Sequence, residues 1–184
     1  MAGASSAWRR NLAGTIAVAA GVAALSLGIP ALNRAIPNAT VSTERPLAFA
    51  ENASVVPPEG ATIDARETSP EQGVVTMAVD GVRYRLTAEA FPGTLRQLAD
   101  RIRAEVQNIS GIQGVSADQP VTSESGVPGL QATFVAENRT GWYTVYLRGG
   151  TGVTAVVDGT DASVTGHRAA LESSVRTVAI DQTA

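Results

Sequence analysis

Apolar positions along the chain follow three patterns, and each predicts a different kind of structure. The first is an unbroken apolar run from Leu12 to Ile29, LAGTIAVAAGVAALSLGI, which contains no charged residue. At about 1.5 Å per helical residue, this run covers most of the ~30 Å hydrocarbon core of a bilayer. We therefore expect a single transmembrane helix at residues 12–32.

A cleaved secretory signal peptide is the alternative interpretation of this run, since Arg9 and Arg10 stand directly before it. The Arg pair also leaves a twin-arginine export signal open. No good small-residue cleavage site follows closely, which favours a retained anchor in the plasma membrane. The basic residues before the run place residues 1–11 in the cytoplasm and the C-terminal part outside it.

Three glycines inside the run, Gly14, Gly21 and Gly28, are spaced at seven and would lie roughly on one side of the helix. Small residues on one side let helices approach closely, so these three form a candidate helix-packing stripe. In a run this rich in Ala and Gly, chance is the alternative explanation. Residues 33–53 follow without a sustained period and are expected to be a linker.

The second pattern has a period of two and predicts strands within a domain at residues 54–184. Val74 to Ala88, VVTMAVDGVRYRLTA, holds two β-rich runs that meet at Asp80-Gly81, which predicts a hairpin with a type I′ turn. Three more runs predict an antiparallel meander: Leu130–Glu137, Trp142–Arg148 and Gly152–Asp158. Their turns are expected at 138–141 and 149–151, with glycines supplying positive φ.

The third pattern has a helical period. Thr94 and Gln97 form a capping-box pair before an amphipathic stretch that extends to about Asn108. A second helix is expected from a cap at Thr160 to Ser163 up to about Val175, with its apolar side at Ala169, Ala170, Leu171 and Val175. Residues 110–129 are expected to be a loop with a short extended piece near Val121, and Val178 and Ile180 a last strand. The fold class is therefore α+β, an antiparallel sheet covered by helices.

Composition limits the classes of function that the chain can have. The 14 basic residues are all arginine, which is typical of a GC-rich bacterial genome. After Arg34 there are 11 arginines and 17 acidic residues, so the exported part is acidic and nucleic-acid binding is not expected. Without cysteine, disulfides, thiol catalysis and thiolate metal sites are excluded.

Catalytic motifs are also lacking. His167 is the single histidine, and although Asp161 and Ser173 are near it in sequence, no nucleophile motif accompanies them. No spacing of carboxylates matches a metal loop. We expect no catalytic residue, cofactor or metal site, while a carboxylate pair formed only by folding stays open.

One hypothesis concerns the aromatic strand Trp142–Arg148. If Tyr143, Val145 and Leu147 face the core, the opposite side presents a patch for a partner protein or an amphiphilic ligand with an anionic head. This candidate patch consists of Trp142, Tyr146, Arg148, Arg83 and Arg85. The alternatives are that the second helix covers Trp142 and Tyr146, and that Arg83 and Arg85 form a solvated face paired with acidic residues.

The order of these segments resembles the PsbP-like fold, which exported actinobacterial proteins such as the LpqN-type lipoproteins share. The resemblance lies in PPEG, the hairpin, the helix TLRQLADRIRAEVQ, the segment GVPGLQATFVAENRTGWYTVYLRGGTGVTAVVDG and the closing helix HRAALESSVRTVAI. Those lipoproteins are held by an acylated cysteine, which this chain lacks. The resemblance implies a non-enzymatic accessory or scaffold subunit.

We therefore expect a single-pass envelope protein whose external domain binds a partner protein in an export, secretion or cell-wall assembly complex. The alternative is an extracytoplasmic domain that binds a small molecule or lipid, or a carboxylate-dependent hydrolase. The sequence leaves the oligomeric state open.

Overall fold

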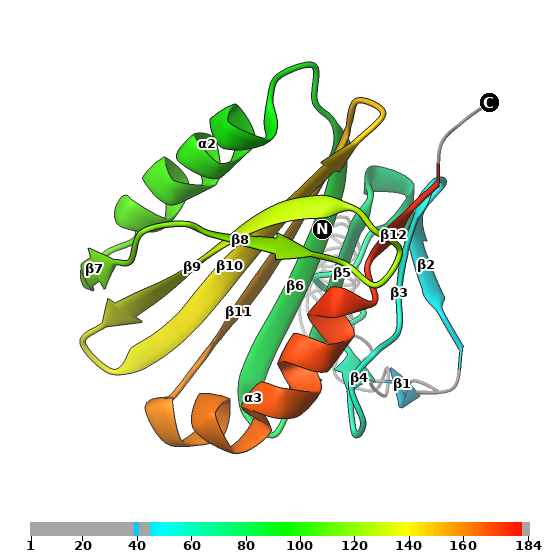
Figure 1. Cartoon of the computed structure of the whole chain (residues 1–184). Coiled ribbons are helices and arrows are strands. Elements are labelled where there is room, and N and C mark those ends of the chain that lie inside the picture. The colour runs from blue at the N-terminus through cyan, green and yellow to red at the C-terminus, as the bar shows by residue number, and fades with distance from the viewer. Residues whose placement is uncertain (1–38, 41–44, 182–184) are drawn as a thin grey trace, which may run out of the picture. The chain divides into compact units, whose positions relative to one another are not determined.

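An antiparallel sheet of nine strands forms the centre of the domain in a computed structural model, which describes residues 39–40 and 45–181 (Figure 1). Its strand order is β1-β4-β5-β6-β11-β10-β9-β7, and β8 also pairs with β9. The strands are β1 (Ala39–Thr40), β4 (Thr62–Ile63), β5 (Val74–Val79), β6 (Val82–Ala90), β7 (Ile112–Val115), β8 (Gln119–Thr122), β9 (Pro128–Ala136), β10 (Arg139–Arg148) and β11 (Thr151–Gly159).

The predicted hairpin and meander are confirmed. Asp80 and Gly81 have φ of 41° and 83°, the positive values of a type I′ turn, and they join β5 to β6. Gly149 and Gly150 make the same kind of reversal between β10 and β11, with φ of 58° and 80°. The predicted 110–129 loop is only partly right, because it contains β7 as well as the expected extended piece at β8.

Gly141 is a correction, because it lies inside β10 and not in a turn; the β9–β10 turn is Glu137-Asn138. A Cβ atom at Gly141 would lie 2.1 Å from the Val157 carbonyl oxygen and 2.7 Å from the Phe134 ring. Glycine is therefore required here because the β11 backbone and the Phe134 ring lie too close for a side chain, not because the position has positive φ.

Two helices pack on opposite faces of the sheet. α2 (Leu95–Gln107) begins with the predicted capping box, in which the Gln97 N–H donates to Thr94 Oγ1 at 3.3 Å and the Thr94 N–H donates to Gln97 Oε1 at 2.8 Å. Its buried side packs on one face with Ala132, Phe134, Tyr143 and Val145. α3 (Asp161–Arg176) packs on the other face, where Trp142 and Tyr146 lie.

The apolar side predicted for α3 is only partly right, because Leu171 and Val175 are buried as expected but the two alanines are not. Val164, Leu171 and Val175 are buried, whereas Ala169 and Ala170 are exposed. Alanine carries too little apolar surface to decide which side of a helix faces the core, and the helix has turned its larger side chains inward.

A second, three-stranded sheet covers the rest of the α3 face. Its order is β12-β3-β2, with β2 at Leu47–Ala50, β3 at Ala53–Val55 and β12 at Ala179–Ile180. Phe49, Val55 and Ile180 from this sheet are buried in the same core as Met77 and Leu86 of the main sheet. The predicted 33–53 linker is therefore too long, because residues 39–40 and 47–53 already belong to strands or turns of the domain. The predicted last strand is confirmed.

The α+β class is confirmed for the part of the chain that the structure describes. Within those residues, no helix is both long and apolar enough to cross a membrane. The expected transmembrane run, its glycine stripe at Gly14, Gly21 and Gly28, and the expected cytoplasmic segment lie outside them.

Candidate functional site

The predicted aromatic patch is not a surface. Trp142 is 0% exposed and Tyr146 is 1% exposed, because α3 and its core partners cover this face of β10. The Arg168 guanidinium lies 5.1 Å from the centre of the Trp142 ring, which places the arginine over the ring from the side of α3. The alternative interpretation of these aromatics as core is therefore the correct one.

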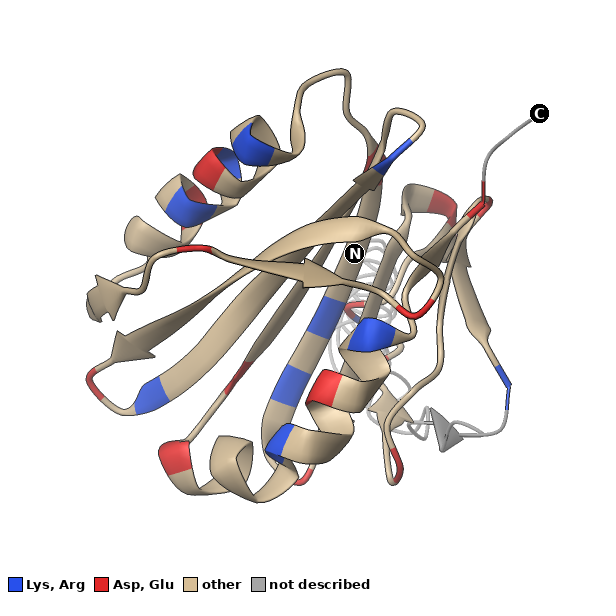
Figure 2. Cartoon of the chain, in the orientation of Figure 1, with Lys and Arg blue, Asp and Glu red and all other residues tan. Residues whose placement is uncertain are grey.

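The predicted arginines are also separated from the aromatics. Arg83 and Arg85 are opposite Asp158 and Val156 of β11, so they project from the α2 face and not from the face of Trp142. They are the blue bands of β6 in Figure 2. Arg83 pairs with Glu67 at 2.5 Å, as in the solvated-face alternative. Arg148 lies at the end of β10 and donates from Nη2 to the Ser125 carbonyl oxygen at 3.2 Å.

His167 is half-buried on α3, with Nε2 3.3 Å from Asp80 Oδ2 in the β5–β6 turn. In residues 39–40 and 45–181, no three His, Cys, Asp or Glu side chains are placed to hold a metal ion. The contacts of His167 thus join α3 to a turn.

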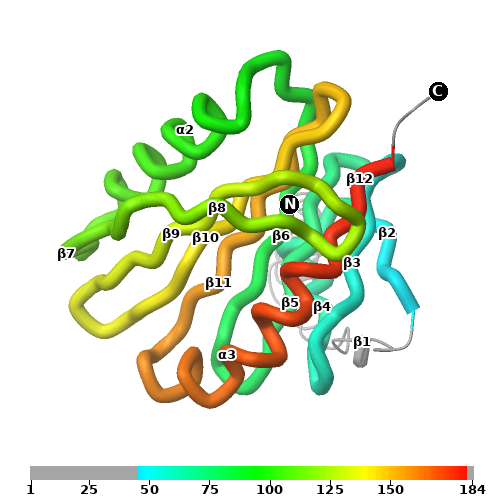
Figure 3. Tube along the Cα trace, in the orientation of Figure 1, coloured from blue at the N-terminus to red at the C-terminus, as the bar shows by residue number. Residues whose placement is uncertain are grey.

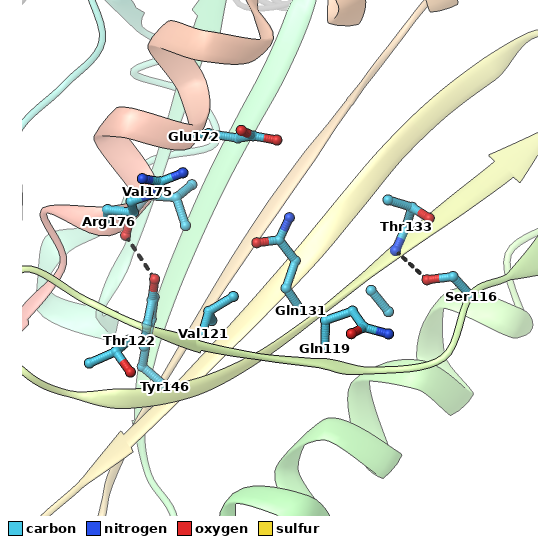
Figure 4. A pocket seen from close by; sticks show the side chains of 11 residues that line it. Ser116, Gln119, Val121, Thr122, Gln131, Thr133, Tyr146, Glu172, Val175 and Arg176 are labelled. Atoms are coloured by element: carbon cyan, nitrogen blue, oxygen red, sulfur yellow. Dashed lines mark hydrogen bonds between the residues drawn. The ribbon is translucent and has the colours of Figure 1, made fainter.

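The structure offers a different candidate site, a cleft of about 460 Å³ between the C-terminal half of α3 and strand β8. We call it the α3–β8 cleft. It is lined by Ser116, Gln119, Val121, Thr122, Gln131, Ala132, Thr133, Tyr146, Glu172, Val175 and Arg176 (Figure 4). Strands β8 and β9 form the floor of the cleft, because α3 packs over β10 and leaves this end of the sheet uncovered.

Free polar groups distinguish this cleft. Gln119 of β8 and Gln131 of β9 are register partners, and Gln131 points from β9 into the cleft (Figure 4). Neither carboxamide, nor the Arg176 guanidinium, makes a side-chain hydrogen bond or ion pair within the described residues. Two other lining side chains are engaged: Tyr146 donates to the Val175 carbonyl oxygen at 3.2 Å, and Glu172 accepts from Arg168 at 2.9 Å.

A buried carboxylate positions one wall of the cleft. The segment from β7 to β8 runs along β9 (Figure 3), and Asp118 lies in its middle, between Ser116 and Gln119. Asp118 accepts hydrogen bonds from Arg96 at 2.9 Å, Arg103 at 2.7 Å and the Tyr143 hydroxyl at 2.8 Å. The network ties this segment to α2 and to the sheet. Sequence reasoning missed Asp118, since nothing in its neighbourhood distinguishes it from a loop aspartate.

The hydroxyl pKa is raised in all three tyrosines of the chain. Burial raises the pKa of Tyr84, and burial together with the hydrogen bond to Asp118 raises the pKa of Tyr143. Burial also raises the pKa of Tyr146, to about 12. Folding therefore favours the neutral phenol at all three positions.

This predicts an alkaline instability. Because each folded-state pKa lies above the ordinary value of about 10, stability is unaffected below about pH 10 and falls as the pH rises above it. In a titration followed by tyrosinate absorbance, we expect no ionisation of the native protein near pH 10, and then ionisation together with loss of circular dichroism. Three phenols that ionise near pH 10 with the fold intact would contradict this.

Comparisons with known proteins identify the fold. No family model matches the sequence, and no curated protein matches it either. Among solved structures, the chain is similar to cyanobacterial PsbP (CyanoP) from Synechocystis, with a TM-score of 0.51, 11% identity and coverage of 80% of this chain and 96% of that one. It is also similar to LpqN of Mycobacterium tuberculosis, which is involved in cell envelope biogenesis, with a TM-score of 0.53, 13% identity and coverage of 78% and 98%. The domain therefore has a PsbP-like fold, as the resemblance implied.

Proposed function

We propose that this chain is a single-pass, membrane-anchored envelope protein whose external domain binds a partner protein as an accessory or scaffold subunit. The apolar run from Leu12 to Ile29 supports the anchor, and Arg9-Arg10 supports a cytoplasmic N-terminus. The fold shared with LpqN supports a place in the envelope. An export, secretion or cell-wall assembly complex is the setting that suits such a subunit.

The observation that carries the proposal is the set of free polar groups in the α3–β8 cleft. A carboxamide both donates and accepts hydrogen bonds, as a peptide group does, so Gln119 and Gln131 match the backbone of an extended polypeptide segment. Arg176 adds a guanidinium, a group enriched at protein interfaces. The cleft thus provides a docking place for one segment of the partner.

The engaged carboxylates favour binding over hydrolysis. Carboxylate-dependent hydrolysis requires two acidic groups facing one substrate, one to donate and one to accept a proton. Glu172 is the acidic residue in the lining of the α3–β8 cleft, and it is paired with Arg168. Asp118, nearby, accepts three hydrogen bonds and is 3% exposed.

The test is site-specific photo-crosslinking with the tagged, full-length protein in its own membranes. A crosslinker at Gln131 should capture one discrete partner, and the same group at exposed Gln107 on α2 should not. Combining Arg176→Ala with Gln119→Ala should reduce capture by about tenfold or more, the size of a typical hot-spot loss.

Three results would contradict the proposal. Equal capture from Gln131 and Gln107 would show that the cleft is not the docking place. Recovery of the bait as uncrosslinked monomer would argue against a partner, and a shortened form in the soluble fraction would replace the anchor with a signal peptide.

A further inference from the structure

We propose that a second groove, on the opposite face of the sheet, binds a single-chain amphiphile with an anionic oxygen head. The groove has a volume of about 500 Å³ and lies between α2 and strands β6 and β11. We call it the α2 groove. It shares no lining residue with the α3–β8 cleft, so failure of either binding site leaves the other intact; only the membrane setting of the test rests on the proposed anchor.

The floor of the α2 groove presents hydrogen-bond donors. Arg85 and Thr87 project from β6 on the same face, and their register partners on β11 are Val156 and Thr154. Thr87 and Thr154 are therefore a direct cross-strand pair, and Arg85 is the next residue of β6 on the same face. One cation and two hydroxyl side chains thus line the same groove.

These donors have no partners within the described residues. Arg85 makes no ion pair or hydrogen bond there, in contrast to Arg83, two residues earlier on the same face, which pairs with Glu67. The Thr154 side chain also makes no hydrogen bond, although the residue is only 7% exposed. The hydroxyl of a nearly buried threonine and a free guanidinium in the lining of one groove favour an anionic oxygen as the ligand group.

The wall of the α2 groove is apolar. Ile102, Val106 and Ile109 follow one another at helical spacing along α2 and its C-terminal end. Ile109 is 55% exposed, one of two large hydrophobic residues that the described surface leaves open. Together with Val156 on the floor, this wall provides a path for a hydrocarbon chain from the head group past Ile109 to solvent.

Charged side chains line the other end of the groove. Arg101 of α2 pairs with Glu89 of β6 and lies 5.0 Å from the centre of the Phe91 ring. Glu89 and nearby Glu105 make this end unfavourable for an anion. The ligand head therefore belongs at Arg85, Thr87 and Thr154, and the volume suits one short chain better than two.

The experiment is a binding titration of the full-length protein in zwitterionic nanodiscs, with empty nanodiscs subtracted. The probes are decanoate, decyl phosphate and decanol, which share a chain and differ in the head. We expect at least one of the two anions to bind about tenfold or more tightly than decanol, and Arg85→Gln to remove that advantage. Arg83→Gln is the matched control, since Arg83 lies on the same face but outside the groove, and it should bind like the parent.

The probe that binds identifies the head group of the ligand. Binding of decanoate alone assigns a carboxylate head, and binding of decyl phosphate alone assigns a phosphate head. Ile109→Asn should weaken binding of every probe that binds, because it interrupts the apolar path. Equal binding of all three probes, no binding beyond empty nanodiscs, or equal effects of Arg85→Gln and Arg83→Gln would each overturn the proposal.

Discussion

Replacing Trp142 with alanine is expected to lower the free energy of unfolding by about 3–5 kcal/mol. The indole is fully buried between α3 and the centre of the main sheet, where it shares a core with Tyr146 and Leu171. Truncation leaves a cavity that the rigid strand β10 and its neighbours are poorly able to close. The contact with Arg168 is lost as well.

The measurement is denaturant unfolding followed by circular dichroism, with Trp142→Phe as the matched variant. Phenylalanine keeps much of the volume, and Trp142 Nε1 has no hydrogen-bond partner among the described residues, so the loss should be much smaller. Partner capture per folded molecule should be unchanged in both variants. A small stability loss combined with abolished capture would restore Trp142 as a surface residue.

Local chemistry made several elements predictable from the sequence. Asp80-Gly81 gives a type I′ turn, because few dipeptides tolerate positive φ at both positions. Thr94 and Gln97 cap α2 through contacts only three residues apart. Each of these signals is complete within a few residues of sequence, so no knowledge of the rest of the fold was required.

Which face of strand β10 is buried could not be predicted in the same way. Trp142 and Tyr146 on one face of β10 are buried, and so are Tyr143 and Val145 on the other. Alternation identifies an inner face only when the other face is polar and meets solvent. With apolar side chains on both sides, the position of α3 decides burial, and that position depends on contacts distant in sequence.

Strands β2 and β3 were missed for a related reason. β2 and β3 are short strands without a clear period, and β3 is completed by β12, more than a hundred residues later in the chain. Pairing over such a separation leaves no local pattern. The α2 groove was missed for the same reason. Arg83 and Arg85 look equivalent in sequence, and only the fold pairs Arg83 with Glu67 and places Arg85 in the groove.

Asp118→Ala is expected to cost about 3 kcal/mol of stability, the lower end of the range for breaking a buried ion pair. The Asp118 carboxylate is 3% exposed, and the Arg103 guanidinium that it binds is mostly buried, whereas Arg96 is largely exposed and can return to water. Removing the carboxylate leaves the Arg103 charge and the Tyr143 hydroxyl without their partner. This uncompensated burial is the main source of the loss.

Asp118→Asn and Asp100→Ala are the matched controls. Asparagine keeps an acceptor for Tyr143 but loses the charge. The stability of Asp118→Asn should therefore lie between that of the parent and that of Asp118→Ala. Asp100 is an exposed acidic residue on α2, and its removal should change stability by less than about 0.5 kcal/mol. If Asp118→Ala unfolds at the same denaturant concentration as Asp100→Ala, the network contributes nothing to stability.

The same substitution distinguishes a positioning role from a purely structural one. Asp118 holds the segment that carries Ser116 and Gln119 on the wall of the α3–β8 cleft, although it does not line the cleft itself. Under conditions where the variant is folded, crosslinking from Gln131 should therefore fall, while binding of the preferred anionic probe in the α2 groove should stay near the parent level. Equal losses at both sites would mean that Asp118 acts on the whole sheet, and its role would then be stability alone.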